Sequence, residues 1–225
     1  MKRPISSFVV LGLAASLLGL SSTAGTAGDH PWSLSDAPFF LHLGASAVPY
    51  DESATIAMDG TTIPGANVSF DPSYTAALEF GWYFTPNFAI ALSSGYPPTV
   101  SAMGAGTIAA YGSLGKVTGG MIELNGQYHF TNFGNFQPYV GAGPTYFHVF
   151  NTQDGALSSF AVDDAFGFNL QIGADWMITK NFGLFVDVKK IFISTSARGF
   201  AGPSTLTSDV RLDPTIISAG LTLRY

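Results

Sequence analysis

The segment from Asp164 to Ile178 alternates large apolar side chains with small or polar ones along its whole length. Its apolar positions are Phe166, Phe168, Leu170, Ile172, Trp176 and Ile178. A period of two residues gives a β-strand one apolar face and one polar face. Soluble strands usually have about five or six residues, whereas a strand that crosses a bilayer at a tilt needs about 9 to 11. The segment therefore predicts a membrane-crossing strand.

The same alternation recurs along the rest of the chain. The predicted strands span 38–48, 73–84, 88–96, 117–130, 137–150, 164–178, 182–195 and 214–225. Short turns rich in Thr, Asn and Pro join some of them, whereas the connections 49–72, 97–116, 151–163 and 196–213 are longer and rich in Gly, Ser, Thr, Asp and Pro. Unpaired backbone groups are too costly in lipid for an open sheet. We therefore predict an all-β fold, an eight-stranded antiparallel transmembrane β-barrel with short periplasmic turns and long extracellular loops.

A soluble eight-stranded barrel is the alternative to a membrane barrel. Its outer surface would carry many Lys and Glu side chains, but charged residues make up only 11% of this chain against a usual fraction of about 25%. Aromatic residues cluster beside the short turns, where an interfacial belt is expected. Low charge and the aromatic pattern favour the membrane barrel.

The first residues have the pattern of a secretory signal peptide. Lys2 and Arg3 precede an apolar run over 5–20 and small residues up to Ala27. We predict a cleaved signal peptide over 1–27, with cleavage after Ala24 as the second choice, and a single barrel domain over 28–225. An uncleaved anchor helix is disfavoured because the apolar run is shorter than the ~20 residues that a spanning helix needs.

Charge and cysteine content exclude several function classes. The formal net charge is −6, and it becomes more negative when the two basic residues of the leader are lost. An acidic exported chain is a poor nucleic-acid binder. Without cysteine the chain has no disulfide and no thiolate ligand or nucleophile. We expect no cofactor, no metal and no nucleic-acid partner, and a location in a Gram-negative bacterial outer membrane.

Two positions conflict with an ideal barrel. Pro144 lies inside a predicted strand, where it cannot donate to a ladder, so we expect a local bulge there. Lys190 occupies one of the alternating strand positions whose side chains are expected to face lipid. A lysine at the bilayer midplane costs about 2–4 kcal/mol, so we expect Lys190 at the outer rim with its ammonium turned toward the head groups.

Three segments resemble the OmpW family of small outer-membrane barrels. They are Phe136–Gly143 with its Pro-Tyr-Val-Gly-Ala-Gly run, Val210–Pro214 with Arg-Leu-Asp-Pro, and Ser218–Tyr225 with a terminal aromatic residue. The resemblance implies a monomeric eight-stranded barrel with a narrow lumen that passes small, often hydrophobic, molecules. It also implies contact with outer-membrane lipid and lipopolysaccharide, and recognition of Tyr225 by the barrel-assembly machinery. The family's frequent Pro-Pro pair early in the fourth strand is replaced here by Gly119-Gly120-Met121-Ile122.

Strand parity divides the side chains between lumen and lipid. The predicted lumen-lining residues are Phe40, His42, Glu79, Tyr83, Glu123, Asn125, Gln127, His129, Tyr139, Phe147, Asn169, Gln171, Asp175, Asp187, Lys189 and Arg224. The predicted lipid-facing residues are Leu78, Phe80, Trp82, Phe166, Phe168, Leu170, Ile172 and Trp176. An eight-stranded barrel is barely wide enough for its own side chains or one small ligand. The polar lumen set is therefore either a hydrogen-bonded plug or the lining of a selective conduit.

The sequence favours a channel for passive passage of small hydrophobic or amphipathic molecules through a narrow lumen. The alternative is a closed structural or adhesive, receptor-like barrel with a plugged polar interior. An enzyme that acts on lipid A would need a nucleophile and base, for example His42, Glu123 or His129 with a serine. Parity turns these histidines inward, and no serine lies in a recognisable elbow motif, so we expect no catalysis.

The connection from Tyr96 to Lys116 is unusually apolar for an exposed loop. Its apolar residues are Val100, Met103, Ile108, Ala109, Ala110, Tyr111 and Leu114. One hypothesis is that this loop extends the barrel wall and, with residues 49–72, forms a funnel that captures nonpolar solutes. The alternative is a loop packed on its neighbours or on lipopolysaccharide chains.

Overall fold

The computed structural model describes residues 37–225, and all its regular elements are strands apart from two short 3₁₀ turns. The predicted signal peptide over 1–27 lies outside the described residues. In the described part of the chain, no helix is both long and apolar enough to span a bilayer. Two sheets account for the strands, and the larger one closes on itself.

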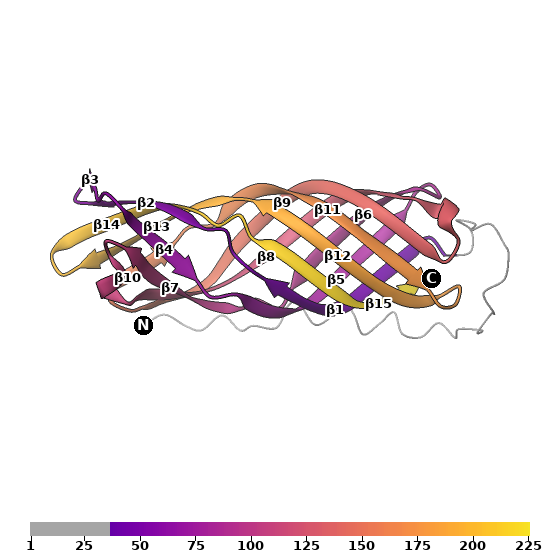
Figure 1. Cartoon of the computed structure of the whole chain (residues 1–225), viewed down its shortest axis with the longest axis horizontal. Helices are drawn as coiled ribbons and strands as arrows, with labels where there is room; N and C mark the ends of the chain where they lie inside the picture. The colour runs from indigo at the N-terminus through magenta and orange to yellow at the C-terminus, as the bar shows by residue number, and fades with distance from the viewer. Residues whose placement is uncertain (1–36) are drawn as a thin grey trace.

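Eight strands form the closed barrel (Figure 1). They are β1 (Phe39–Val48), β5 (Ser73–Tyr83), β6 (Phe88–Gly95), β8 (Ser113–His129), β9 (Phe136–Asp154), β11 (Ala165–Met177), β12 (Phe182–Phe192) and β15 (Thr215–Arg224). Each pairs antiparallel with the next, and β15 pairs with β1 to close the ring. The eight-stranded antiparallel barrel predicted from the alternation is confirmed, with strand ends within a few residues of those expected.

The dyad alternation sets which side chains face inward. In β11, Phe166 is 80% exposed and Ile172 61% exposed, whereas Asn169 and Gln171 between them are 0% and 4% exposed. The apolar side chains form the outside of the wall and the polar ones fill the inside. This arrangement is inverted relative to a soluble barrel and suits a lipid surrounding.

The short turns and the C-terminus lie at one end of the barrel (Figure 1). Aromatic rings on the outer face gather there, and Phe88 packs against Tyr128, which packs against Phe130, each with ring centroids 4.9 Å apart. Phe136 and Trp176 make a similar contact at 6.1 Å. These rings have the position of the interfacial belt at the periplasmic boundary.

The long connections at the opposite end contain strands of their own (Figure 1). They are β2 (Ser53–Met58), β3 (Thr61–Thr62), β4 (Ala66–Phe70), β7 (Thr99–Gly106), β10 (Ser158–Val162), β13 (Ser194–Ala201) and β14 (Ser204–Arg211). β4 and β7 add to the barrel sheet beside β8, and β10, β13, β14, β2 and β3 form the second sheet. The wall therefore continues well beyond the eight-stranded part. The expectation that residues 96–116 extend the wall is confirmed, whereas the predicted loop 196–213 is a β-hairpin.

The bulge expected at Pro144 is absent. Pro144 pairs with Phe168 of β11, and on the β8 side the ladder is interrupted but resumes at Gly126 without a register shift. The shift between β8 and β9 lies instead between Thr118 and Gly119. Proline lacks only the N–H that would donate to the ladder. Leaving a few ladder positions unpaired accommodates it, and no extra residue is inserted as a bulge.

Lys190 lies at the outer end of β12, as its parity and position predict. Its Nζ donates to the carbonyl oxygen of Asp213 at 2.5 Å and lies 3.6 Å from a carboxylate oxygen of Asp51. The ammonium is thus held by the extracellular connections, away from the apolar band.

Two glycines of the Pro-Tyr-Val-Gly-Ala-Gly run face the barrel interior, and both are crowded. A Cβ on Gly141 would lie 2.8 Å from the side-chain oxygen of Gln171, and one on Gly143 would lie 1.9 Å from the carbonyl oxygen of Leu124. Only glycine lets the wall approach its neighbours this closely. The motif therefore provides space for the polar side chains of the interior.

Candidate functional site

A buried ionic cluster centred on Lys189 fills the middle of the barrel. The Lys189 ammonium donates to Glu79 at 2.9 Å, to Glu123 at 3.1 Å and to the Ser93 hydroxyl at 2.6 Å. Ser93 also donates to Glu123 at 2.7 Å. All four side chains are less than a tenth exposed. A buried charge is tolerated when it is paired and hydrogen-bonded in this way.

A second ionic group lies toward the short-turn end. Arg224 donates to Asp175 at 2.7 Å and to the Gln137 side chain at 2.6 Å. The His42 ring lies between two carboxylates, with Nδ1 3.2 Å from Glu79 and Nε2 3.0 Å from Asp175. The Nε2 contact lacks hydrogen-bond geometry, so it is an ion-pair contact only. His42 therefore links the Lys189 cluster to the Arg224 pair.

Side-chain amides join these groups across the lumen. Gln171 donates to Glu79 at 3.1 Å and to Asp187 at 2.8 Å, and it accepts from Asn125 and Gln127 at 2.9 and 3.0 Å. Tyr139 closes the network by donating to Asp187 at 2.9 Å. Residues from six different strands therefore form one hydrogen-bonded layer across the interior.

Aromatic rings pack among the polar groups. The His42 ring stacks on Phe185 at 4.4 Å and contacts Phe40 at 4.8 Å. His129 stacks on Tyr139 at 4.8 Å, and its Nδ1 lies 3.0 Å from the Tyr83 hydroxyl. Neither histidine has a serine positioned beside it as a nucleophile in these contacts. Their geometry is that of packed, hydrogen-bonded interior residues.

All sixteen residues predicted to line the lumen point into the barrel and are at most 8% exposed. Fifteen of them belong to the packed layers or contact them, whereas Phe147 borders the apolar space above. Seven of the eight predicted lipid-facing residues are exposed on the outside; their relative exposure ranges from 41% for Phe80 to 80% for Phe166. Leu78 is half-buried. The polar set thus lies together and fills the membrane-depth interior.

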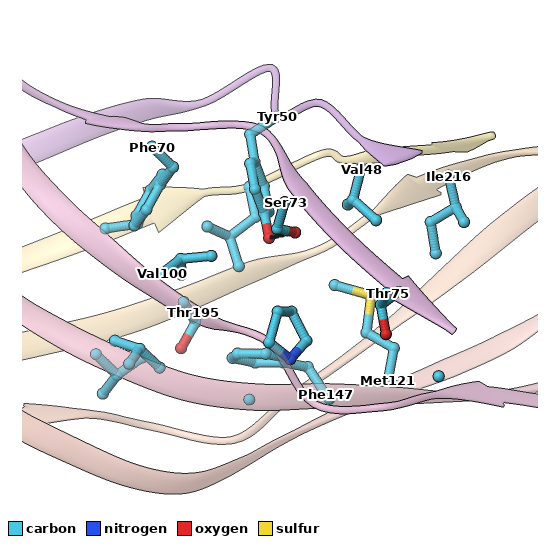
Figure 2. A pocket seen from close by; sticks show the side chains of 18 of the residues that line it. Val48, Tyr50, Phe70, Ser73, Thr75, Val100, Met121, Phe147, Thr195 and Ile216 are labelled. Carbon is cyan, nitrogen blue, oxygen red and sulfur yellow. Dashed lines mark hydrogen bonds between the residues drawn. The ribbon is translucent and has the colours of Figure 1, made fainter. Parts of the chain in front are cut away.

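Above the polar layer the interior becomes an apolar cavity of about 150 Å³, lined by residues of the barrel strands and of the extracellular strands. Its floor includes Glu79, Glu123 and Lys189. Its wall includes Ile56, Leu114, Val117, Leu157, Phe160 and Leu206, all at most 6% exposed. Figure 2 shows side chains from the barrel strands and from the extracellular strands turned into this space. A dry apolar cavity of this size holds a molecule such as benzene.

The barrel wall beside this cavity is interrupted between β5 and β7. The β5–β6 ladder ends at Ala77 and the β4–β7 ladder starts at Phe70, and both have the same register. Residues 71–75 and 97–101 therefore face each other, and within the described chain no backbone hydrogen bond joins them. Five residue pairs at about 3.3 Å each give an opening about 17 Å long.

Prolines and tyrosines mark this wall opening. Pro72 lies on one edge, and Pro97 and Pro98 lie on the other. Proline has no N–H for a ladder bond, which explains why pairing fails here. Tyr74 and Tyr96 at the edges are 79% and 73% exposed. Ser73, Tyr96, Pro98 and Val100 line both the apolar cavity and the surface hollow at the opening, so the two spaces lie next to each other.

A further polar group lies on the outer wall and was not anticipated from the sequence. Asp164, between β10 and β11, accepts from the Tyr146 hydroxyl at 2.6 Å, from the Val149 N–H at 2.7 Å and from His148 Nδ1 at 2.8 Å. These hydrogen bonds, that from Tyr146 first, lower the pKa of the Asp164 carboxyl to about 2. The group ties the outer end of β9 to the start of β11. In residues 37–225, no three or more His, Asp or Glu side chains are grouped to hold a metal ion.

Sequence reasoning found the interior residues but missed most of the cavity wall. Ile56, Leu157 and Leu206 lie in connections that were expected to be irregular. Alternation over 204–210 was the available signal, because Leu206 and Val210 point inward while their neighbours are exposed. The run is short and rich in Ser and Thr, which is why it does not stand out as a strand.

The OmpW family model matches residues 36–225. The chain belongs to the OmpW family. It is a protein of the bacterial outer membrane. The motifs in Phe136–Gly143 and Val210–Pro214 indicated this family correctly.

Known relatives cover most of the chain. The dibenzothiophene metabolism operon protein PahQ of Pseudomonas aeruginosa is 29% identical over 83% of this chain and 88% of its own length. Outer membrane protein AlkL of Ectopseudomonas oleovorans is 29% identical over 76% of this chain and 74% of its own. The solid-state NMR structure of AlkL in lipid bilayers matches with a TM-score of 0.69 at 26% identity, covering 92% of this chain and 94% of AlkL.

The crystal structure of OprG from Pseudomonas aeruginosa has the same fold. It aligns with a TM-score of 0.78 over 84% of this chain and 96% of OprG, at 24% identity. The barrel fold is therefore shared although about three quarters of the aligned residues differ.

Proposed function

We propose that this OmpW-family protein takes small hydrophobic molecules from the outside into the apolar cavity and releases them sideways through the wall opening. The observation that carries the proposal is that the apolar cavity shares lining residues with an unpaired stretch of wall between residues 71–75 and 97–101. The name of PahQ, a dibenzothiophene metabolism operon protein, is consistent with a hydrophobic cargo. Passage needs binding and diffusion, and no chemical step.

The sideways route is preferred over the full length of the lumen for a physical reason. A nonpolar solute that continued downward would have to displace Lys189, Glu79 and their partners from a hydrogen-bonded layer. Leaving a buried charge unpaired costs about 3–5 kcal/mol, and a nonpolar solute offers nothing in return. The wall opening requires no such rupture.

The level of the opening also supports release into lipid. Trp82 belongs to the aromatic belt near the short turns, and a tilted strand needs about 9 to 11 residues to cross the bilayer. Counting back along β5 from Trp82 puts Ser73 and Tyr74 near the outer interface. A solute leaving there enters the outer leaflet below the lipopolysaccharide head groups.

The proposal is tested with vesicles whose outer leaflet is lipopolysaccharide, with and without the protein. Toluene transfer into the vesicles is expected to be faster with protein, while potassium conductance in planar bilayers stays at background. A Thr75→Trp variant fills the junction of cavity and opening and should reduce toluene transfer at least tenfold. Ser194→Trp, on the exposed outer face of β13, is the matched control.

Three results would contradict the proposal. Toluene transfer by the Thr75→Trp variant at the wild-type rate would exclude the wall opening as the route. Steady ion conductance by the wild type would point to the central lumen. If toluene transfer is no faster than in protein-free vesicles, the alternative of a closed structural or adhesive barrel is favoured, which the packed interior also supports.

A further inference from the structure

Tyr50 lies where the apolar cavity meets the wall opening. It follows β1 directly, and its ring packs against Phe70 with centroids 5.6 Å apart. Its hydroxyl lies 3.1 Å from the hydroxyl of Ser73. Figure 2 shows Tyr50 reaching from one strand segment to Ser73 on another, with the two oxygens side by side. The hydroxyl pair therefore spans the boundary between two parts of the wall.

Ser73 is shared by the two spaces. It lines the apolar cavity, and it also lines the surface hollow at the wall opening, together with Pro72 and Tyr74. It is 8% exposed. A solute on the proposed route passes from the cavity to the opening beside the Tyr50–Ser73 pair.

The pair has an unused hydrogen-bond donor. Two hydroxyl groups carry two hydrogens, and a single hydrogen bond between them uses one. Within residues 37–225 neither group has a second hydrogen-bond partner. Burial raises the pKa of the Tyr50 phenol above its ordinary value, so the phenol keeps its hydrogen near neutral pH. One O–H is thus available to a ligand.

Most other hydroxyls of the cavity lining are already engaged. They include Ser46 with Ser218 at 2.7 Å, Ser93 with Glu123 at 2.7 Å, Ser94 with the Met121 carbonyl at 3.1 Å and Thr195 with the Asp163 carbonyl at 2.6 Å. The buried hydroxyl of Ser208 has no hydrogen-bond partner in the described residues, but Ser208 does not border the surface hollow at the wall opening. Most of the remaining lining is aliphatic or aromatic. The Tyr50–Ser73 pair is therefore the polar point that a solute meets near the exit.

We propose that Tyr50 and Ser73 determine specificity, and that the protein prefers small, neutral, mainly hydrophobic molecules that carry one hydroxyl or carbonyl oxygen over pure hydrocarbons. The inference rests on the proposed function. A ligand oxygen accepts the spare O–H while the ligand's ring or chain lies on the apolar wall. An ionised carboxylate is disfavoured because burying an unpaired charge is far more costly than burying a hydroxyl.

The test compares two probes of nearly equal size, toluene and p-cresol, with wild-type protein and the double variant Tyr50→Phe with Ser73→Ala, because either single variant leaves one hydroxyl with a free hydrogen. The measurement is transfer into vesicles with a lipopolysaccharide outer leaflet, corrected for the protein-free rate of each probe. A neutral hydrogen bond contributes about 0.5–1.5 kcal/mol, so the double variant should lower the p-cresol to toluene ratio about 2- to 10-fold. Tyr111→Phe, which removes an exposed hydroxyl outside the cavity, is the control.

The outcomes separate the two proposals. If protein accelerates neither probe, the proposed function fails. If both probes are accelerated and the ratio is the same in wild type and in the double variant Tyr50→Phe with Ser73→Ala, the function stands and the specificity inference is wrong. A loss of preference in the double variant with toluene transfer retained supports the inference. A gel-mobility assay of the folded barrel shows that each variant has assembled.

Discussion

Replacing Lys189 with methionine removes the central cation of the buried cluster while keeping most of the side-chain volume. Glu79 and Glu123 then lose an ammonium at 2.9 and 3.1 Å. Both carboxylates are at most 5% exposed, so water does not replace the lost partner. Breaking a buried ion pair by removing one member costs about 3–5 kcal/mol. We expect the Lys189→Met variant to lose unfolding free energy of this size.

The assay is equilibrium urea unfolding of the barrel in lipid vesicles, followed by tryptophan fluorescence and gel mobility. Lys180→Met, at the exposed turn between β11 and β12, is the control and should change the unfolding free energy by less than about 0.5 kcal/mol. The double variant Lys189→Met with Glu123→Gln should be more stable than Lys189→Met alone, because it no longer buries the Glu123 charge without its cation. If Lys189→Met is as stable as the Lys180→Met control, the cluster does not stabilise the fold and the reasoning is wrong.

Two other predictions concern the outside of the wall. Ile172→Arg puts a charge near the middle of the lipid-facing side of β11 and should cost about 2–4 kcal/mol in the same unfolding assay; an unchanged stability would mean that this face does not meet lipid. For Asp164, the folded pKa of about 2 lies below the ordinary value of about 4, so its stabilising contribution is present above pH 4 and is lost as the pH falls through 2. Asp164→Asn should therefore speed hydrogen exchange of the Val149 amide at pH 6, and the difference from wild type should shrink at pH 2.

The membrane part of the fold could be predicted because one rule, alternation of apolar and polar side chains, acts along every barrel strand. Each strand such as β11 or β12 has lipid on one side and a packed polar interior on the other. Few residue types are therefore compatible with each position of these strands. The rule even placed Lys190 at the rim. It failed at Pro144, because local sequence does not show whether a missing N–H is accommodated by a bulge or by loss of ladder pairs.

The extracellular half was less predictable for a physical reason. Its strands, such as β2 and β14, are short, and their partners are distant in the sequence. Many residues of these strands are Ser or Thr, so the two faces of each strand differ little in hydrophobicity. The wall opening could not be predicted either, because it depends on Pro72 and the pair Pro97 and Pro98 lying on facing edges of the same stretch of wall, which becomes visible only once the register is known.

The polar layer in the barrel has a consequence for the membrane that contains it. Side chains that hydrogen-bond to one another fill the lumen at membrane depth. Under the proposed function, we expect this layer to hold back salt, so that a cell could carry many copies of the protein without dissipating ion gradients. Selectivity against water-soluble compounds would then come from the interior itself, and it would need no gate that opens and closes.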